Sequence, residues 1–193
     1  QEIIRRNYHA LNRLAMEKGD QDEVYKINLL MNQAKITTAM RRVIAPCMER
    51  AQKLGAPAAA MELDDGQLVT GKTSSLLGAS AALLLNAIKA LAGIDKELDL
   101  LPSSIIAPIS DMKISHLGHR NPRLHSDEVL IALSISAVTN PLAERVLKKL
   151  DDLRGCDAHF SVILSEEDEK LYKRLGIHVS CQPRYEIKRL YHK

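Results

Sequence analysis

Residues 66–73 carry the plainest chemical signal in this chain, because Gly-Gln-Leu-Val-Thr-Gly-Lys-Thr matches the phosphate-loop pattern G-x-x-x-x-G-K-[ST]. In nucleoside triphosphatases this pattern binds phosphates through backbone N–H groups and the neighbouring lysine. Such a loop needs a compact turn of small residues, whereas Leu68, Val69 and Thr70 alternate as a strand does. The residue types therefore favour a strand here over a triphosphate loop.

A β-hairpin accounts for the first half of the motif. Asp64-Asp65-Gly66 is a strong turn signal between the runs 58–63 and 67–70, which places Gly66 in a hairpin turn. The apolar run that ends in a magnesium-binding aspartate is also missing, since Leu98-Asp99-Leu100-Leu101 fits that pattern poorly.

The second half of the motif, from Gly71 onward, is still compatible with an anion-binding site. The apolar run 76–91 predicts a helix over 74–92, with Thr73 or Ser74 as its N-cap. The first N–H groups of a helix favour a phosphate, sulfate or carboxylate, and Lys72 adds a positive charge. Ordinary capping beside a solvated lysine is the alternative. The candidate residues are Gly71, Lys72, Thr73, Ser74 and Ser75.

The loop 118–125 is the second candidate for anion contacts, because it holds two arginines and two histidines. Arginine forks suit carboxylate and phosphate ligands. If the loop folds over the start of the predicted helix 74–92, it completes an anion pocket with Lys72. The alternative is a solvated loop whose cations pair with Asp127 and Glu128. The residues assigned to the candidate site are Arg120, Asn121, Arg123 and His125.

Two Cys/His pairs, Cys156-x-x-His159 and His178-x-x-Cys181, have the ligand types of a zinc site. Residues three apart on a strand point to opposite faces, so the spacing does not favour a metal site. Thiol catalysis would need a cysteine of low pKa beside a histidine base, for which Cys156 and His159 are the candidate pair, and buried structural thiols are the default. No metal site, cofactor or catalytic residue is identifiable from the sequence, and enzymatic activity stays open.

Composition limits the classes of partner. Aromatic residues make up 3% of the 193 residues, with no Trp, which argues against base-stacking surfaces for nucleic acid. A net charge of +3 is too mild to predict nucleic-acid binding. The run 76–88 is too short for a membrane span, which needs about 20 apolar residues. Three widely spaced cysteines suggest reduced thiols and a cytoplasmic location.

Hydrophobic periodicity predicts a helical unit over 1–54, followed by an α/β domain over 55–193. Helix 74–92 is apolar nearly all round, so it should be covered on both sides in a layered domain with a mixed sheet. A basic tail follows Pro183. Besides the hairpin, the predicted elements are helices over 1–17, 22–34, 46–54, 74–92, 103–117 (bent or started late at Pro108), 127–139, 141–150 and from 165, and strands over 158–164 and 177–181.

The chain resembles the C-terminal part of a bacterial family catalogued as domain of unknown function eighteen forty-six. The resemblance covers nearly the whole chain, from Gln1 to Pro183. The most specific segments are Gly71-Lys-Thr-Ser-Ser-Leu-Leu-Gly-Ala-Ser-Ala-Ala-Leu-Leu-Leu-Asn-Ala-Ile-Lys89, Asn121-Pro-Arg-Leu-His125, Asp127-Glu-Val-Leu-Ile-Ala-Leu-Ser-Ile-Ser-Ala137 and Leu153-Arg-Gly-Cys156.

This resemblance implies a larger cytoplasmic protein whose N-terminal half, absent here, carries its own Gly-rich phosphate-loop-like turn. It implies a helical connector and then a three-layer α/β/α domain of cytidine-deaminase-like topology. It supplies no established activity and no catalytic residues. The zinc ligands of deaminases, His-x-Glu and Pro-Cys-x-x-Cys, are absent, since Pro46-Cys47-Met48-Glu49 has no second cysteine.

Two functions follow as hypotheses. The first is binding of a phosphorylated metabolite or nucleotide phosphate at Gly71–Ser75, helped by Arg120 or Arg123, with any catalysis shared with the N-terminal half. The second is structural, with the helices of 1–54 and the apolar helices holding a homo-oligomer together. A thiol or zinc enzyme at Cys156 is a third possibility.

Overall fold

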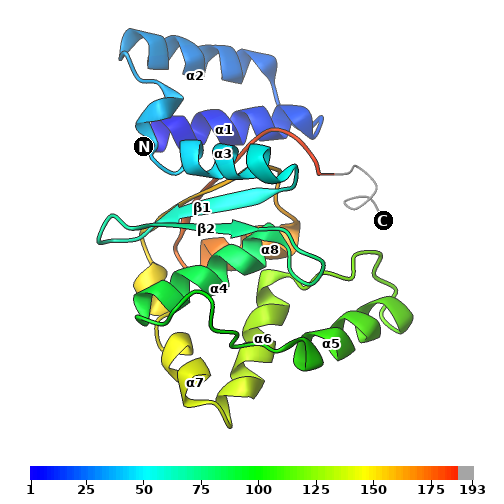
Figure 1. Cartoon of the computed structure of the whole chain (residues 1–193). Helices are drawn as coiled ribbons and strands as arrows, with labels where there is room; N and C mark the ends of the chain where they lie inside the picture. Colours follow the sequence, from blue (N-terminus) through cyan, green and yellow to red (C-terminus); the bar gives the residue numbers. More distant parts are fainter. Residues whose placement is uncertain (187–193) are drawn as a thin grey trace.

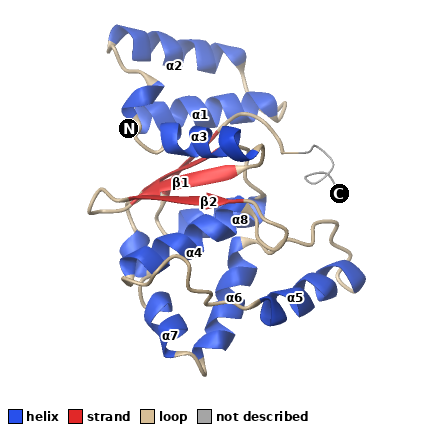
Figure 2. Cartoon of the chain, viewed as in Figure 1, coloured by secondary structure: helices blue, strands red, loops and turns tan. Residues whose placement is uncertain are grey.

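The computed structural model describes residues 1–186, and its central layer is a four-stranded sheet with helices on both faces (Figures 1 and 2). β1 pairs antiparallel with β2 and β3, and β3 pairs parallel with β4, so the predicted α/β fold with a mixed sheet is confirmed. The cytidine-deaminase-like topology stays a prediction. In sheet order the strands are β2 (Leu68–Lys72), β1 (Ala58–Glu62), β3 (Asp157–Phe160) and β4 (His178–Cys181).

Strand direction brings three loops to one end of the sheet. Because β1 is antiparallel to both of its neighbours, β2, β3 and β4 all run the same way. The segments that follow these strands, 73–78, 161–165 and 182–186, therefore start from the same end of the sheet. In open α/β sheets, ligands bind at the carboxyl ends of strands.

One face of the sheet is covered by the N-terminal helices. Helix α3 (Ile44–Leu54) packs on β1 through Cys47 and Ala60, and helix α1 (Glu2–Ala15) lies along β4. Helix α2 (Gln21–Gln33) packs on the outer side of α1, after which comes the short 3-10 helix η1 (Thr38–Met40) (Figure 1). Helix α3 begins two residues before the predicted start at Pro46, because Val43 has helical rather than extended dihedral angles.

Arg41 joins these helices to the sheet. Its side chain is only 1% exposed, and its guanidinium donates to Asp157 Oδ1 at 2.7 Å and to Ser180 Oγ at 3.0 Å. It also donates to the backbone carbonyls of Ala158 and His178. The helices before residue 55 thus form one layer of the sandwich, and the division of the chain into units 1–54 and 55–193 stays a prediction.

The other face carries the main core. Helices α4 (Ala79–Leu91), α6 (Ser126–Ala137) and α8 (Glu166–Arg174) supply its buried side chains, together with Phe160 of β3. The ring of Phe160 meets that of Tyr172 edge-on at 5.1 Å. Helices α5 (Ser103–Ser115) and α7 (Pro141–Leu147) lie farther from the sheet (Figure 1), and the 3-10 helix η2 (Asp151–Leu153) leads into β3.

Several predicted boundaries were wrong. The strand predicted over 158–164 ends at Phe160, and the helix predicted to 150 ends at Leu147. Helix α5 begins at Ser103, as predicted, and continues through Pro108 rather than starting there. The basic tail predicted after Pro183 falls largely on residues 187–193, outside the described residues. Within residues 1–186, no helix is both long and apolar enough to cross a membrane.

Candidate functional site

The predicted anion loop is not the start of a helix, so that part of the prediction was wrong. Gly71 and Lys72 belong to strand β2, and α4 begins only at Ala79, with Gly78 as N-cap. Between them, Ser74 closes a local turn, because its Oγ accepts the N–H of Leu76 at 3.2 Å and of Leu77 at 3.0 Å. That turn competes with the helix and delays it.

Close packing against helix α4, rather than contact with a ligand, explains why residue 71 is a glycine. A Cβ atom placed on it would lie 2.3 Å from the backbone nitrogen of Leu83 and 2.7 Å from the carbonyl oxygen of Ala79. Strand β2 and helix α4 therefore approach each other backbone to backbone at this position, which only glycine permits.

The structure does bring the two predicted segments together. The N–H of Leu124 donates to the carbonyl of Leu76 at 3.0 Å, and the N–H of Gly78 donates to the carbonyl of Leu124 at 3.4 Å. Residues 76–78 and 124 thus run side by side as a short parallel bridge. The sequence left open whether the loop 118–125 folds over the start of this helix, and the contact places residue 124 of the loop beside residues 76–78.

The cations of these segments differ in their partners. Lys72 and Arg120 are exposed and form no ion pair within residues 1–186. Arg123 is paired with Glu186 at 2.8 Å, and its backbone N–H donates to Asn121 Oδ1. Lys72 and Arg120 are therefore the candidate anion contacts whose charge is not neutralised within residues 1–186. The charge of Arg123 is paired with Glu186.

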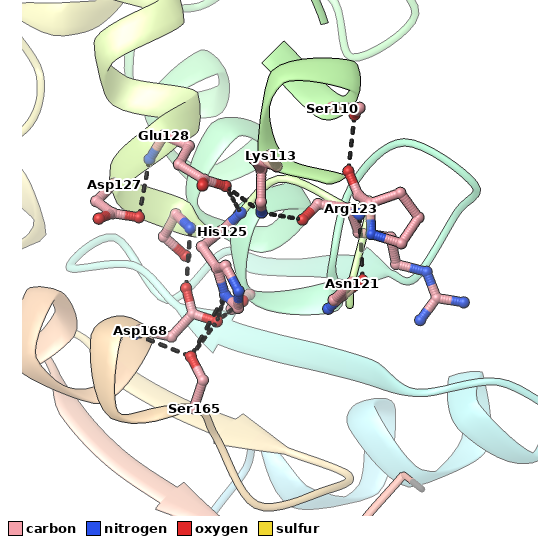
Figure 3. Close-up of polar contacts among 12 residues, drawn as sticks. Ser110, Lys113, Asn121, Arg123, His125, Asp127, Glu128, Ser165 and Asp168 are labelled. Carbon is pink, nitrogen blue, oxygen red and sulfur yellow. Dashed lines mark hydrogen bonds and ion pairs between the residues drawn. The ribbon is translucent and has the colours of Figure 1, made fainter. Parts of the chain in front are cut away.

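Asp168 belongs to the polar cluster in Figure 3 and is buried. Its Oδ1 accepts the backbone N–H of Ser126 at 2.9 Å, and its Oδ2 accepts the hydroxyl of Ser80 at 2.7 Å. Burial alone raises the pKa of this carboxyl, but hydrogen bonds from His125, Ser126 and Ser80 outweigh it and lower the pKa to about 2. The first turns of α4, α6 and α8 thus meet around one ionised carboxylate.

His125 is a partly exposed member of this cluster (Figure 3). Its Nδ1 lies 3.4 Å from Asp168 Oδ2 and 3.4 Å from Ser165 Oγ. The hydrogen bond to Asp168 raises the pKa of the imidazole, against the opposing effect of burial. Within the described residues Nε2 has no hydrogen-bond partner, so the ring is fixed through one nitrogen and leaves the other for a ligand.

Lys113 and Glu128 hold the backbone at His125. The buried ammonium of Lys113 donates to Glu128 Oε2 and to the carbonyl of Arg123, both at 2.7 Å. Glu128 in turn accepts the backbone N–H of His125 at 2.7 Å, as the N3 glutamate of a capping box does. The helix α6 consequently begins at Ser126 with His125 as N-cap, one residue earlier than the predicted helix at Asp127.

The cluster is suited to holding an anion or moving a proton, but it is not a nucleophilic triad. In a Ser-His-Asp triad the serine and the carboxylate contact different ring nitrogens. Here Ser165 and Asp168 both approach Nδ1 of His125. A histidine oriented by a carboxylate, with its second nitrogen free, is a hydrogen-bond donor that carries a positive charge once it is protonated.

A groove of about 290 Å³ opens beside the loop 73–78. Ser74, Leu76 and Leu77 form part of its wall, and apolar side chains from residues 98–106 form another part. Lys89 also lines the groove, where its ammonium donates to the carbonyls of Lys96 and Leu98 at 2.6 Å each. The groove has room for the uncharged part of a small ligand.

Sequence reasoning missed several members of the cluster: Ser80, Lys113, Ser165 and Asp168. The sequence alone places Ser165 at the start of a predicted helix and assigns Asp168 to no site. The one available signal was the Ser165-x-x-Asp168 spacing, which places an acid at the third helical position, where it can face a neighbouring element. The pairing with Ser80, 88 residues away, has no local signature.

The predicted Cys/His pairs do not converge on a common site. His159 is fully buried against Ser180, and burial together with Arg41 lowers its pKa to about 3. Burial raises the pKa of Cys156 to about 11 and of Cys47 and Cys181 to about 12, and none of the three is in a disulfide. Within the described part of the chain, no three His, Cys, Asp or Glu side chains are grouped to hold a metal ion.

Comparison with known proteins agrees with the resemblance drawn from the sequence. Residues 39–191 match the family model described as "Domain of unknown function DUF1846, C-terminal". A UPF0371 protein of Corynebacterium glutamicum is 50% identical over all 193 residues, and those of Corynebacterium efficiens and Streptococcus pneumoniae are 49% and 48% identical. The chain spans 39% of the length of these relatives, so it corresponds to a segment of a longer protein. The chain belongs to the DUF1846 family, as its C-terminal domain.

Proposed function

We propose that this segment binds a phosphate-bearing small molecule at the end of the sheet where β2, β3 and β4 finish, with His125 as the principal anion contact. The observation that carries the proposal is the His125–Asp168 pair. A buried carboxylate holds the imidazole by Nδ1 and favours its protonated form, while Nε2 has no partner within residues 1–186. An imidazolium presented in this way is a hydrogen-bond donor that carries a positive charge.

The surrounding charges support an anionic ligand. Lys72 ends β2, Arg120 lies in the loop that reaches His125, and neither is neutralised by an ion pair within residues 1–186. The predicted residues Thr73, Ser74 and Ser75 lie in the adjacent loop, and the groove beside it offers space for the rest of the ligand. A phosphorylated metabolite or a nucleotide phosphate fits these features.

Binding is favoured over complete catalysis by this segment alone. The cluster supplies one oriented histidine and no aligned nucleophile, since Ser165 shares Nδ1 with Asp168. The segment spans 39% of its relatives, so we propose that any reaction uses groups from the rest of the longer protein as well.

The proposal is tested by thermal unfolding of the full-length protein in the presence of inorganic phosphate, ATP, NAD or coenzyme A. A ligand at a hundred times its dissociation constant adds about 2.7 kcal/mol to the stability of the folded state. We expect stabilisation of the wild type that is reduced in Lys72→Ala and lost in His125→Gln. Lys170→Ala, which removes an exposed lysine on α8, is the control and should respond as the wild type does. Equal stabilisation of His125→Gln and the wild type would contradict the proposed contact.

A second candidate function, homo-oligomer assembly, is favoured by the outer face of α2. Tyr25, Leu29 and Leu30 of α2 are exposed, while the buried side chains of this helix pack mainly on α1. Sedimentation of the wild type and of Leu30→Glu distinguishes the two functions, because assembly through α2 predicts a smaller species for the variant. We also propose a cytoplasmic location, which the three unpaired thiols support.

A further inference from the structure

Helix α6 is apolar on two opposite faces, but the structure covers only one of them. Val129, Ala132 and Leu133 point into the core and are fully buried. On the opposite side, Ile131 is 59% exposed, Ile135 is 61% exposed and Val138, just after the helix, is 82% exposed. A helix that is apolar all round is normally buried all round.

The three exposed residues form one continuous surface, called here the α6 stripe: Ile131, Ile135 and Val138. Their spacing of i, i+4 and i+7 places them along a single side of the helix. Between Val129 and Ala143 the chain has no charged residue, although 26% of its residues are charged. The stripe therefore lacks the charged residues that normally make an exposed helix face soluble.

The neighbouring helix has the same character. Helix α5 leaves Met112, Ile114 and Leu117 at its end exposed, and it is linked to α6 through the ion pair between Lys113 and Glu128. Helices α5 and α6 lie together at the lower side of the molecule in Figure 1, on the side away from α1 to α3. An apolar surface of this kind marks an interface rather than a solvated face.

We infer that the α6 stripe is covered by the part of the longer protein that lies outside this segment. The relatives extend beyond the matched segment by 61% of their length, which is more than enough polypeptide to form a covering domain. Permanent interfaces are more apolar than transient ones, and a charge-free stripe is of the permanent type. A domain on the same polypeptide is always present at a high effective concentration.

A photo-crosslinking residue placed at position 135 of the full-length protein tests this inference. We expect a cross-link within one chain, from position 135 to a peptide that lies outside the 193 residues of this segment, identified by mass spectrometry. The same probe at position 170, an exposed site on α8, is the matched control and should give much less of that product. Position 131, on the same stripe, repeats the test should the change at 135 disturb folding.

The other outcomes contradict the inference. A product of twice the chain mass, joining position 135 of one copy to another copy, would assign the stripe to a homodimer. A yield at positions 135 and 131 no higher than at position 170 would show that the stripe is solvated in the full-length protein. Neither result would bear on phosphate binding at His125, which lies at the opposite end of α6 from Val138.

Discussion

The carboxylate of Asp168 accepts the backbone N–H of Ser126 at 2.9 Å, so a residue of α8 caps the first turn of α6. The second oxygen of the same carboxylate accepts the hydroxyl of Ser80, at the start of α4. Helix N-termini carry unpaired N–H groups and a partial positive charge, which a buried anion satisfies. One side chain thus holds three helices in the arrangement that positions His125.

Replacing Asp168 by asparagine should destabilise the protein by about 3 kcal/mol, because a charged acceptor of several buried donors is lost. Asp127→Asn is the control, since Asp127 is exposed and accepts only the N–H of Glu128. Urea unfolding of the two variants and the wild type provides the measurement. Equal stabilities of Asp168→Asn and Asp127→Asn would show that the three helices do not depend on this carboxylate.

The contribution of Asp168 should depend on pH. Its pKa is about 2 in the folded state against 3.8 in a free chain. The folded-state pKa is depressed, so this stabilisation is fully present above pH 4 and is lost as the pH falls towards 2. The loss should amount to about 2 kcal/mol, and it should be absent from the pH profile of Asp168→Asn.

His125 should titrate above the ordinary histidine pKa of 6.5, because its protonated form bonds to Asp168. Its contribution to stability is present below pH 6.5 and is lost as the pH rises through the folded pKa. Nuclear magnetic resonance of the imidazole Hε1 signals against pH measures this pKa directly. In Asp168→Asn the pKa of His125 should fall, and an unchanged value there would rule out the carboxylate as the cause.

Gly71→Ala should lower the stability by about 3 kcal/mol, because its Cβ would overlap the backbone of α4. Gly78→Ala is a matched test a few residues away, with a φ of −67° and the nearest atom 3.7 Å from the added Cβ. It should lower the stability by no more than about 1 kcal/mol, the cost of replacing an N-cap glycine by alanine. Similar losses from both substitutions would mean that strand β2 does not rest on α4 as described.

Arg41 forms a buried ion pair and its sequence neighbour Arg42 forms an exposed one, so substitutions of the two residues compare the two kinds of pair. Arg41→Ala leaves Asp157 without its buried partner and should cost about 4 kcal/mol of stability. Arg42 pairs with Glu62 at the surface, so Arg42→Ala should cost less than about 1 kcal/mol. Thermal unfolding measures both, and a small effect of Arg41→Ala would indicate that the N-terminal helices are not tied to the sheet.

The sequence was informative where local patterns decide the structure. The turn at Asp64–Gly66 predicted the β1–β2 hairpin, and periodicity predicted nearly every helix. It misplaced the start of α4 because the hydroxyl of Ser74 forms its own turn before an apolar run that otherwise continues as a helix. Of the residues in the candidate site, the sequence pointed to His125 and the loop that carries it, and ligand binding there stays a prediction. Asp168 could not be assigned to it, because its contacts to Ser80 and Ser126 exist only after the helices pack.

The proposed site is tested most directly by titrating the full-length protein with inorganic phosphate. The nuclear magnetic resonance signal of the His125 imidazole is recorded at each phosphate concentration. We expect a saturable movement of that signal and a rise in the pKa of His125, since a bound anion favours the protonated ring. The buried His159 is an internal control whose signal should not move. A His125 signal that does not respond, or that drifts without saturation together with all other histidines, would contradict phosphate binding at this position.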